Sequence, residues 1–221
     1  MGFALPSHQY VCIANHRCVF LNLAQDRYFC LPPDLESPFL SLLSGAEPPN
    51  AGTRDIERLV ELGVIVPSVT HDLTSPSREV LARTSSRFDV LHSAPNPWLV
   101  LRAVLSQRRA TRDLSRLPLL SVLTSLREAK AQDGQRHGNT PIPSRHIAAY
   151  RTATRILSSQ DQCLRTAVGF TRLLNRDGYF PNMVIGVRMS PFRAHAWVQD
   201  RGTVLTDTLD TVLPFTPILV I

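Results

Sequence analysis

Three side chains in the second half of the chain, Cys163, His195 and Asp207, are of the kinds used in nucleophilic acyl chemistry. A cysteine thiolate attacks a carbonyl carbon, and a histidine deprotonates the thiol and later protonates the leaving amine. A carboxylate beside the imidazole selects its tautomer and stabilises its charged form. The three residues therefore suit a cysteine hydrolase or an acyl transferase.

Cys163 stands where a helix is expected to begin. The stretch SSQDQCLRTAVGFTRLL places apolar residues at helical spacing after the cysteine, and Ser158, Ser159 and Asp161 before it favour a helix N-cap. The positive end of the helix dipole lowers the pKa of a thiol at that position. A free cysteine is also often a small buried hydrophobic residue, and this stretch alone favours that interpretation.

Stabilisation of an oxyanion is expected close to the same helix start. The backbone N–H of Cys163 is one candidate donor, and the side chain of Gln160 or Gln162 is another. The spacing does not decide between the two glutamines.

The segment FRAHAWVQD predicts a strand that carries the histidine. Its alternation places His195, Trp197 and Gln199 on one face. Asp207 lies twelve residues after His195, and antiparallel strands joined at Arg201–Gly202 would bring its carboxylate beside the imidazole. Taken alone, a histidine in an apolar strand is more often a hydrogen-bonded core residue.

The surrounding elements predict an α+β fold. In the second half the expected helices span 97–110, 119–132, 145–158 and 163–176, and the expected strands span 180–189, 192–200 and 203–209. Helices therefore come first and an antiparallel sheet follows.

The first half predicts a smaller domain of three strands plus helices. The expected strands are 8–14, 17–23 and 27–31, and the expected helices are 35–45 and 53–63. Residues 76–95, rich in Ser, Thr and Pro, indicate a linker with at most one strand. We therefore expect one domain over 1–75 and a second over 96–221.

Composition excludes several classes of protein. The chain of 221 residues is 43% hydrophobic and 19% charged, as globular proteins are, and it has no apolar run long enough to span a bilayer. The N-terminus lacks a signal-peptide pattern, so we expect a cytoplasmic protein without a membrane partner. The cysteines, at 12, 18, 30 and 163, lack paired Cys-x-x-Cys spacing, so we expect no metal and no cofactor.

Basic residues gather between 101 and 160, where 11 stand against 3 acidic residues, within a formal net charge of +6. A nucleic acid or an acidic peptide would suit such a surface. Because no aromatic interleaving or RNA-binding motif accompanies the charge, we expect a solvated helical surface and no nucleic-acid partner.

The segment from Cys163 to Asp207 resembles the transglutaminase-like cysteine protease domain of lasso-peptide B proteins. That family has a Cys-Leu-Arg helix, a Leu-Leu-x-x-x-Gly turn, a Val-Ile-Gly-Val strand, Pro-Phe-x-x-His-Ala-Trp-Val and then Asp. Each piece stands here in that order. The resemblance implies a papain/transglutaminase-like fold with Cys163, His195 and Asp207 as its catalytic triad.

The first 75 residues are similar to the small winged-helix-like domain that recognises leader peptides of ribosomally made precursors. In that domain the leader adds as a strand to a sheet edge and seats apolar side chains against a helix. The candidate leader contacts here are Tyr28, Phe29, Leu31, Ile56, Leu59 and Val60. Each of them is explained at least as well as a core residue of the small domain.

Together these resemblances imply a leader peptidase of lasso-peptide biosynthesis. It would cut the leader from the precursor and free the core's N-terminal amine, which a partner ATP-dependent cyclase joins to an Asp or Glu side chain. Two alternatives stay open. One is a transglutaminase-type acyl transferase with the same triad, and the other is a non-enzymatic winged-helix protein that binds nucleic acid.

Overall fold

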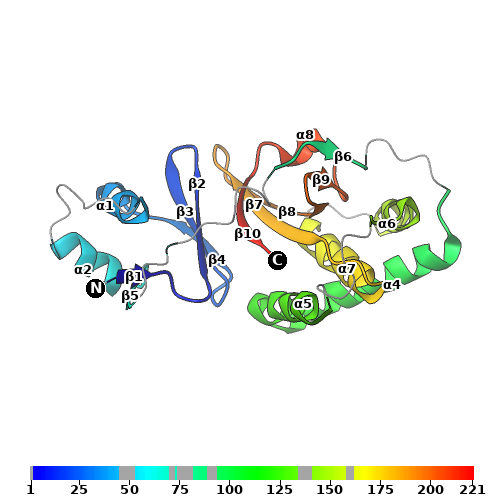
Figure 1. Ribbon diagram of the computed structural model, residues 1–221, viewed down its shortest axis with the longest axis horizontal. Coiled ribbons are helices and arrows are strands. Elements are labelled where there is room, and N and C mark those ends of the chain that lie inside the picture. The colour runs from blue at the N-terminus through cyan, green and yellow to red at the C-terminus, as the bar shows by residue number, and fades with distance from the viewer. Residues whose placement is uncertain are drawn as a thin grey trace. The chain divides into compact units, whose positions relative to one another are not determined.

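The computed structural model describes residues 2–44, 53–69, 73, 82–88, 94–133, 141–157 and 162–221. The chain folds as two compact units, Met1–Ser75 and Pro76–Ile221. Both units combine helices with strands, so the predicted α+β class is confirmed (Figure 1).

The first unit contains a three-stranded antiparallel sheet in the order β2-β3-β4. β2 (Gln9–Ala14) and β3 (Arg17–Asn22) form a hairpin, and β4 (Arg27–Cys30) pairs with the other side of β3. These strands confirm the three predicted ones. A separate two-stranded sheet joins β1 (Gly2–Ala4) to β5 (Val66–Ser68).

Helices α1 (Pro33–Leu43) and α2 (Thr53–Glu61) complete the core of the first unit. Phe20 of the sheet stacks on Phe29 at 4.9 Å between ring centroids and meets Phe39 of α1 edge-on at 5.1 Å. The core residues include Val11, Cys18, Phe20, Leu31, Leu35, Phe39, Leu42, Leu59, Val64 and Ile65. The arrangement is one of strands plus helices, as expected, and its winged-helix identity stays a prediction.

The second unit is built on a five-stranded sheet in the order β10-β7-β8-β9-β6. The strands are β6 (Ser85–Ser86), β7 (Asn182–Arg188), β8 (Arg193–Asp200), β9 (Thr203–Val204) and β10 (Thr216–Val220). All pairs are antiparallel except β6 with β9. The predicted strands 180–189 and 192–200 are confirmed as β7 and β8, whereas β9 is shorter than the predicted strand 203–209 and β10 was not predicted.

Part of the expected linker belongs to this sheet. Besides β6, Arg83 donates to the carbonyl oxygens of Val212 and Phe215, at 2.7 and 2.6 Å. Arg87 donates to the carbonyl oxygen of Ile142 at 2.6 Å. Residues 82–88 are therefore an edge of the second unit, because their hydrogen bonds tie them to segments far along the chain.

The helices of the second unit form layers on the sheet. Helix α7 (Cys163–Arg176) packs on β7 and β8, and α4 (Pro97–Arg116) packs on α7 (Figure 1). The remaining helices are α5 (Leu119–Asp133), α6 (Ser144–Ile156) and the short α8 (Leu209–Val212). The four predicted long helices are confirmed, and α4 continues beyond the predicted end at 110.

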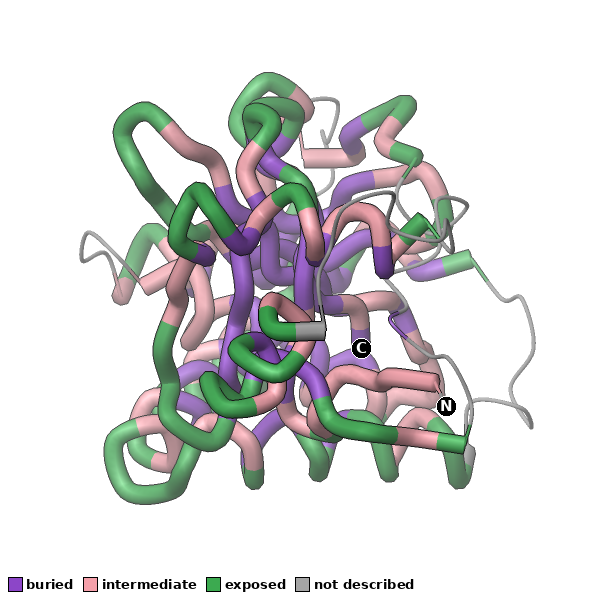
Figure 2. The backbone as a smooth tube through the Cα atoms, turned by 90° about the vertical axis from the view of Figure 1, so that its left-hand side faces the viewer, coloured by how far each residue is buried: buried purple, intermediate pink, exposed green. Residues whose placement is uncertain are grey.

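Burial follows these layers. Figure 2 shows buried residues along the strands and on the inner sides of helices, with exposed residues at turns and on outer helix faces. In the second unit Trp197, Val184 and Val204 are fully buried in one cluster. Apolar burial of this kind stabilises the sheet by roughly 25 cal/mol per Å² removed from water.

Candidate active site

Cys163 is the first residue of α7, as the sequence predicts, and its side chain is partly buried. Burial tends to raise the pKa of its thiol. The hydrogen bond from His195, the backbone N–H groups of Ala196 and Leu164, and the charge of the imidazole outweigh burial and lower that pKa below its ordinary value. These neighbours, His195 foremost, therefore favour the nucleophilic thiolate.

His195 connects the thiol to a carboxylate. Its Nε2 lies 3.1 Å from Oδ1 of Asp207, which leaves Nδ1 for the thiol of Cys163. Burial alone would lower the pKa of His195, but the hydrogen bonds with Asp207 and Cys163 and their charges raise it to about 9. The structure thus brings all three predicted catalytic side chains together, in an arrangement that favours a thiolate beside an imidazolium.

Asp207 is held by residues that no pattern in the sequence indicates. β9 ends at Val204, so Asp207 follows the strand instead of lying within it. Thr206 Oγ1 donates to Asp207 Oδ2 at 2.7 Å and accepts from the backbone N–H of Val198 at 3.0 Å. The hydroxyl of Ser86 donates to the backbone carbonyl of Asp207 at 2.8 Å. Both oxygens of the carboxylate are therefore oriented, one by the imidazole and one by Thr206.

The predicted alternation of β8 is confirmed. Trp197 Nε1 donates to Gln199 Oε1 at 2.8 Å, and the rings of His195 and Trp197 stack at 6.2 Å between centroids. Phe215 adds a second ring 5.3 Å from His195. The imidazole is therefore positioned by aromatic neighbours as well as by hydrogen bonds.

The sequence pattern of the Transglutaminase-like superfamily matches residues 101–220, more than half of the chain. This range contains the thiol, the imidazole and the carboxylate. The chain belongs to the transglutaminase-like superfamily. Membership implies chemistry of the cysteine protease or acyl transferase type. No curated protein and no solved structure gives a significant match.

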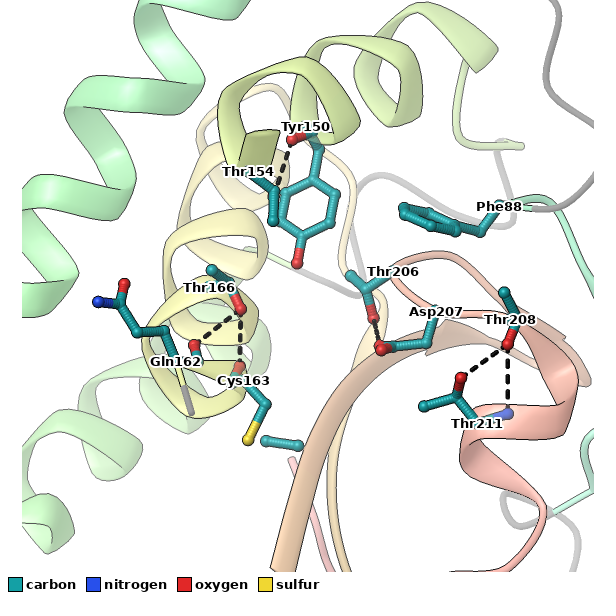
Figure 3. Close-up of a pocket in the computed structure, with 11 residues that line it drawn as sticks. Phe88, Tyr150, Thr154, Gln162, Cys163, Thr166, Thr206, Asp207, Thr208 and Thr211 are labelled. Carbon is teal, nitrogen blue, oxygen red and sulfur yellow. Dashed lines mark hydrogen bonds between the residues drawn. The ribbon is translucent and has the colours of Figure 1, made fainter. Parts of the chain in front are cut away.

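Two cavities of the transglutaminase-like domain flank the thiol. The first measures about 290 Å³. Besides Cys163 and Asp207, it is lined by hydroxyl and aromatic groups, which include Phe88, Tyr150, Thr154, Thr166, Thr206 and Thr211 (Figure 3). Burial raises the pKa of Tyr150 far above its usual value, so its hydroxyl stays neutral.

The second cavity measures about 660 Å³ and carries charge. Besides Cys163 and His195, it is lined by Arg188, Arg193 and Asp210, with Phe215 among the other lining residues. Apart from the predicted site residues, the lining of both cavities is not indicated by the sequence, because it comes from elements that are far apart in the chain.

The predicted oxyanion donors are only partly placed. Gln160 lies outside the described residues. Gln162 immediately precedes α7 and lines both cavities, yet its amide extends away from the thiol in Figure 3. The backbone N–H of Cys163 lies in the first turn of α7, where no helix carbonyl is available to it. The role of both glutamines stays a prediction.

The predicted leader contacts in the first unit fall into two groups. Leu31 and Leu59 are 3% and 0% exposed and belong to the hydrophobic core of the first unit, although Leu31 also lines a cavity beside β4. The other four lie partly exposed on β4 and α2, namely Tyr28, Phe29, Ile56 and Val60. Their role as leader contacts stays a prediction.

The described residues contain no group of three or more His, Cys, Asp or Glu side chains that could hold a metal ion. Within the same residues, no helix combines the length and apolar character needed to cross a membrane.

Proposed function

We propose that this chain is a cytoplasmic leader peptidase, a cysteine protease that binds the leader of a lasso-peptide precursor and removes it. One observation carries the catalytic part. The thiol of Cys163 is hydrogen bonded to His195, whose other ring nitrogen lies 3.1 Å from Asp207. The motif resemblance from Cys163 to Asp207 supports the choice of a lasso precursor as the substrate.

The proposed reaction proceeds through a thioester. The Cys163 thiolate attacks the carbonyl carbon of the scissile peptide bond, and the His195 imidazolium protonates the departing amine. His195, now neutral, takes a proton from water, whose oxygen attacks the thioester carbonyl; the C–S bond breaks and the Cys163 thiolate is regenerated. The products are a leader with a free carboxylate and a core with a free N-terminal amine.

The first unit is proposed to hold the leader along β4. Among the described residues β4 pairs only with β3, so one edge of this strand is open to an added strand. A cavity of about 370 Å³ adjoins it, lined by Phe29, Leu31, Leu62 and Val64 among others. Because one chain carries both units, a bound leader would raise the effective concentration of the scissile bond at Cys163.

An ATP-dependent lasso cyclase is the proposed partner. The freed amine is a nucleophile, and condensation with an Asp or Glu side chain requires activation of that carboxylate. Nothing in the proposed thiol chemistry supplies this activation, so a separate enzyme must consume the product.

Replacing Cys163 with alanine tests the catalytic proposal. We expect Cys163→Ala to abolish cleavage of the precursor from the same gene neighbourhood while leader binding is retained, because only the nucleophile is removed. Mass spectrometry of the incubated precursor, with and without the cyclase and ATP, measures the outcome. Cleavage by the alanine variant at near wild-type rate would refute the mechanism.

Cys12→Ala is the matched control. Burial, followed by the proximity of Cys18 and Cys30, raises the pKa of the Cys12 thiol to about 12, so this thiol stays protonated. We expect Cys12→Ala to keep the single cut at the leader–core boundary.

Acyl transfer to an amine is the second candidate, because membership of the superfamily is compatible with both reactions. The same thioester would then be attacked by an amine instead of water. The leader product would carry an amide in place of the carboxylate, and its mass distinguishes the two reactions.

A further inference from the structure

Two arginines face each other at the end of the β7–β8 hairpin nearest the thiol. Arg188 and Arg193 are directly opposite in the strand register, and both line the larger cavity together with Cys163 and His195. Like charges in directly opposed positions of an antiparallel pair destabilise the sheet. Such a pair beside a candidate active site indicates that something else compensates for the repulsion.

The described residues supply only part of that compensation: the Phe215 ring lies 5.7 Å from the guanidinium carbon of Arg188, and Arg193 is exposed to solvent. The Nε atom of Arg188 is buried and has no hydrogen-bond partner among them. No ion pair of the described residues includes either arginine, although Asp210 lines the same cavity. A buried donor without an acceptor costs free energy, so an acceptor from a ligand would be favoured here.

The cavity itself is shaped for a substrate residue with an apolar stem and an anionic end. The Phe215 ring centroid lies 5.3 Å from that of His195 and 5.7 Å from the guanidinium carbon of Arg188. The aromatic ring thus contacts both the imidazole of the candidate active site and the guanidinium of Arg188. A guanidinium offers parallel N–H groups that match the two oxygens of a carboxylate.

We propose that Arg188 and Arg193 form a subsite for a substrate carboxylate close to the scissile bond, on the leaving-group side. This proposal rests on the proposed protease function. His195 must reach the departing nitrogen to protonate it, so the segment after the scissile bond passes His195 and enters the cavity that His195 lines. The carboxylate is either an Asp or Glu side chain or the end of a peptide chain.

Peptide libraries distinguish these sources. One library consists of octapeptides blocked at both ends with mixed residues at three positions on each side of the cleavage site, and a second has a free C-terminal carboxylate. We expect kcat/KM for Asp or Glu after the scissile bond to exceed that for Asn or Gln by at least about tenfold. If the chain end is the ligand, only the second library shows a comparable gain, for peptides cut near their C-terminus.

Arg188→Gln and Arg193→Gln test the residues. The acid-to-amide ratio is kcat/KM for peptides with Asp or Glu after the scissile bond divided by kcat/KM for those with Asn or Gln. We expect this ratio to fall toward one in each variant, whatever happens to the absolute rate. Arg116→Gln removes the same charge from an exposed position at the end of α4 and should keep the wild-type ratio. Three results would overturn the subsite. The wild-type ratio could be near one in both libraries, or the acidic preference could be confined to positions before the scissile bond. The ratio could also stay unchanged in the Arg188 and Arg193 variants.

Measurements of peptide binding distinguish the proposed carboxylate subsite from the proposed protease function. With the Cys163→Ala protein, the dissociation constants of blocked acidic and amide peptides are compared by titration calorimetry, which needs no cleavage. Tighter binding of the acidic peptide, lost with Arg188→Gln in the same background, would support the subsite even if the wild-type protein cleaves nothing. Equal binding of both peptides, together with efficient cleavage by the wild type, would retain the protease and reject the subsite.

Discussion

The proton on His195 is held by two neighbours, the Asp207 carboxylate and the Cys163 thiolate. Burial of the imidazole would lower its pKa, yet these partners raise that pKa to about 9. The protonated form, which donates to the leaving amine, therefore persists until the pH rises through about 9. Above that pH the acid needed for departure of the amine is lost.

Removing the charge of Asp207 should therefore change the pH profile of the reaction. For Asp207→Asn we expect the alkaline limb of kcat/KM to move from about pH 9 to lower pH, because a neutral amide no longer holds the imidazole proton. We also expect kcat to fall by roughly 100-fold or more, since the imidazole loses its orienting partner. Initial rates across pH 5–10 at constant ionic strength measure both effects.

Asp200→Asn is the control for that substitution. It removes the same charge from the last residue of β8, the strand that carries His195 near its start. The ion pairs of the described residues do not join Asp200 to His195. Asp207 does not control the proton on His195 if the alkaline limb stays in place for Asp207→Asn. The same conclusion follows if the limb moves equally for Asp200→Asn.

Helix α7 carries the nucleophile, and its position depends on a close approach to α4. A Cβ added at Gly169 would lie 2.9 Å from Cα and 3.1 Å from N of Gln107, closer than packed atoms allow. The hydroxyl of Ser106 also donates to the Gly169 carbonyl at 2.8 Å. The missing side chain therefore sets the distance between the two helices.

Replacing Gly169 with alanine distinguishes packing from helix propensity. Propensity alone predicts a gain of about 1 kcal/mol, because alanine suits a helix interior better than glycine. We expect the free energy of unfolding to fall by roughly 1–3 kcal/mol instead, because the methyl group meets the backbone of α4. Denaturant titration followed by tryptophan fluorescence reports on the second unit, which contains both Trp98 and the buried Trp197.

Arg176→Ala provides the comparison on the same helix. Arg176 is exposed in the last turn of α7, so its removal should change the free energy of unfolding by less than about 0.5 kcal/mol. Stabilisation by Gly169→Ala would contradict the role assigned to the close approach of the helices.

The division into two units separates the proposed tasks of leader binding and cleavage. Part of the basic excess between 101 and 160 is used within the second unit, where Arg102 pairs with Asp177 at 2.5 Å and Lys130 donates to Asn182. These contacts give a structural reason for some of the charge. The nucleic-acid alternative stays untested by them.

A free leader peptide should inhibit cleavage of the full precursor but not hydrolysis of a short peptide. If the first unit holds the leader, excess leader competes with the full precursor and raises its apparent KM. A short peptide that spans only the scissile bond has no leader segment, so its hydrolysis should continue at an unchanged rate. Parallel assays with the leader and with a scrambled leader measure this difference. Equal inhibition of both reactions by the leader would mean that it binds at the active site and not on the first unit.

Local patterns in the chain were sufficient to predict most helices and strands and the start of α7 at Cys163. Apolar spacing and helix-capping residues act over a few neighbouring positions, so they can be read without knowledge of the fold. The face shared by Trp197 and Gln199 follows from the two-residue period of a strand in the same way. The pairing of His195 with Asp207 was accessible because a single turn separates their segments.

Interactions between distant segments determined the rest. Thr206 supports Asp207 through a hydrogen bond that its sequence position does not reveal, and Arg83 reaches the carbonyl of Phe215 from the other end of the domain. The opposition of Arg188 and Arg193 depends on the register of β7 against β8. Such partners are selected by burial and by the need to satisfy polar groups, which act through space and leave no periodic pattern in the chain.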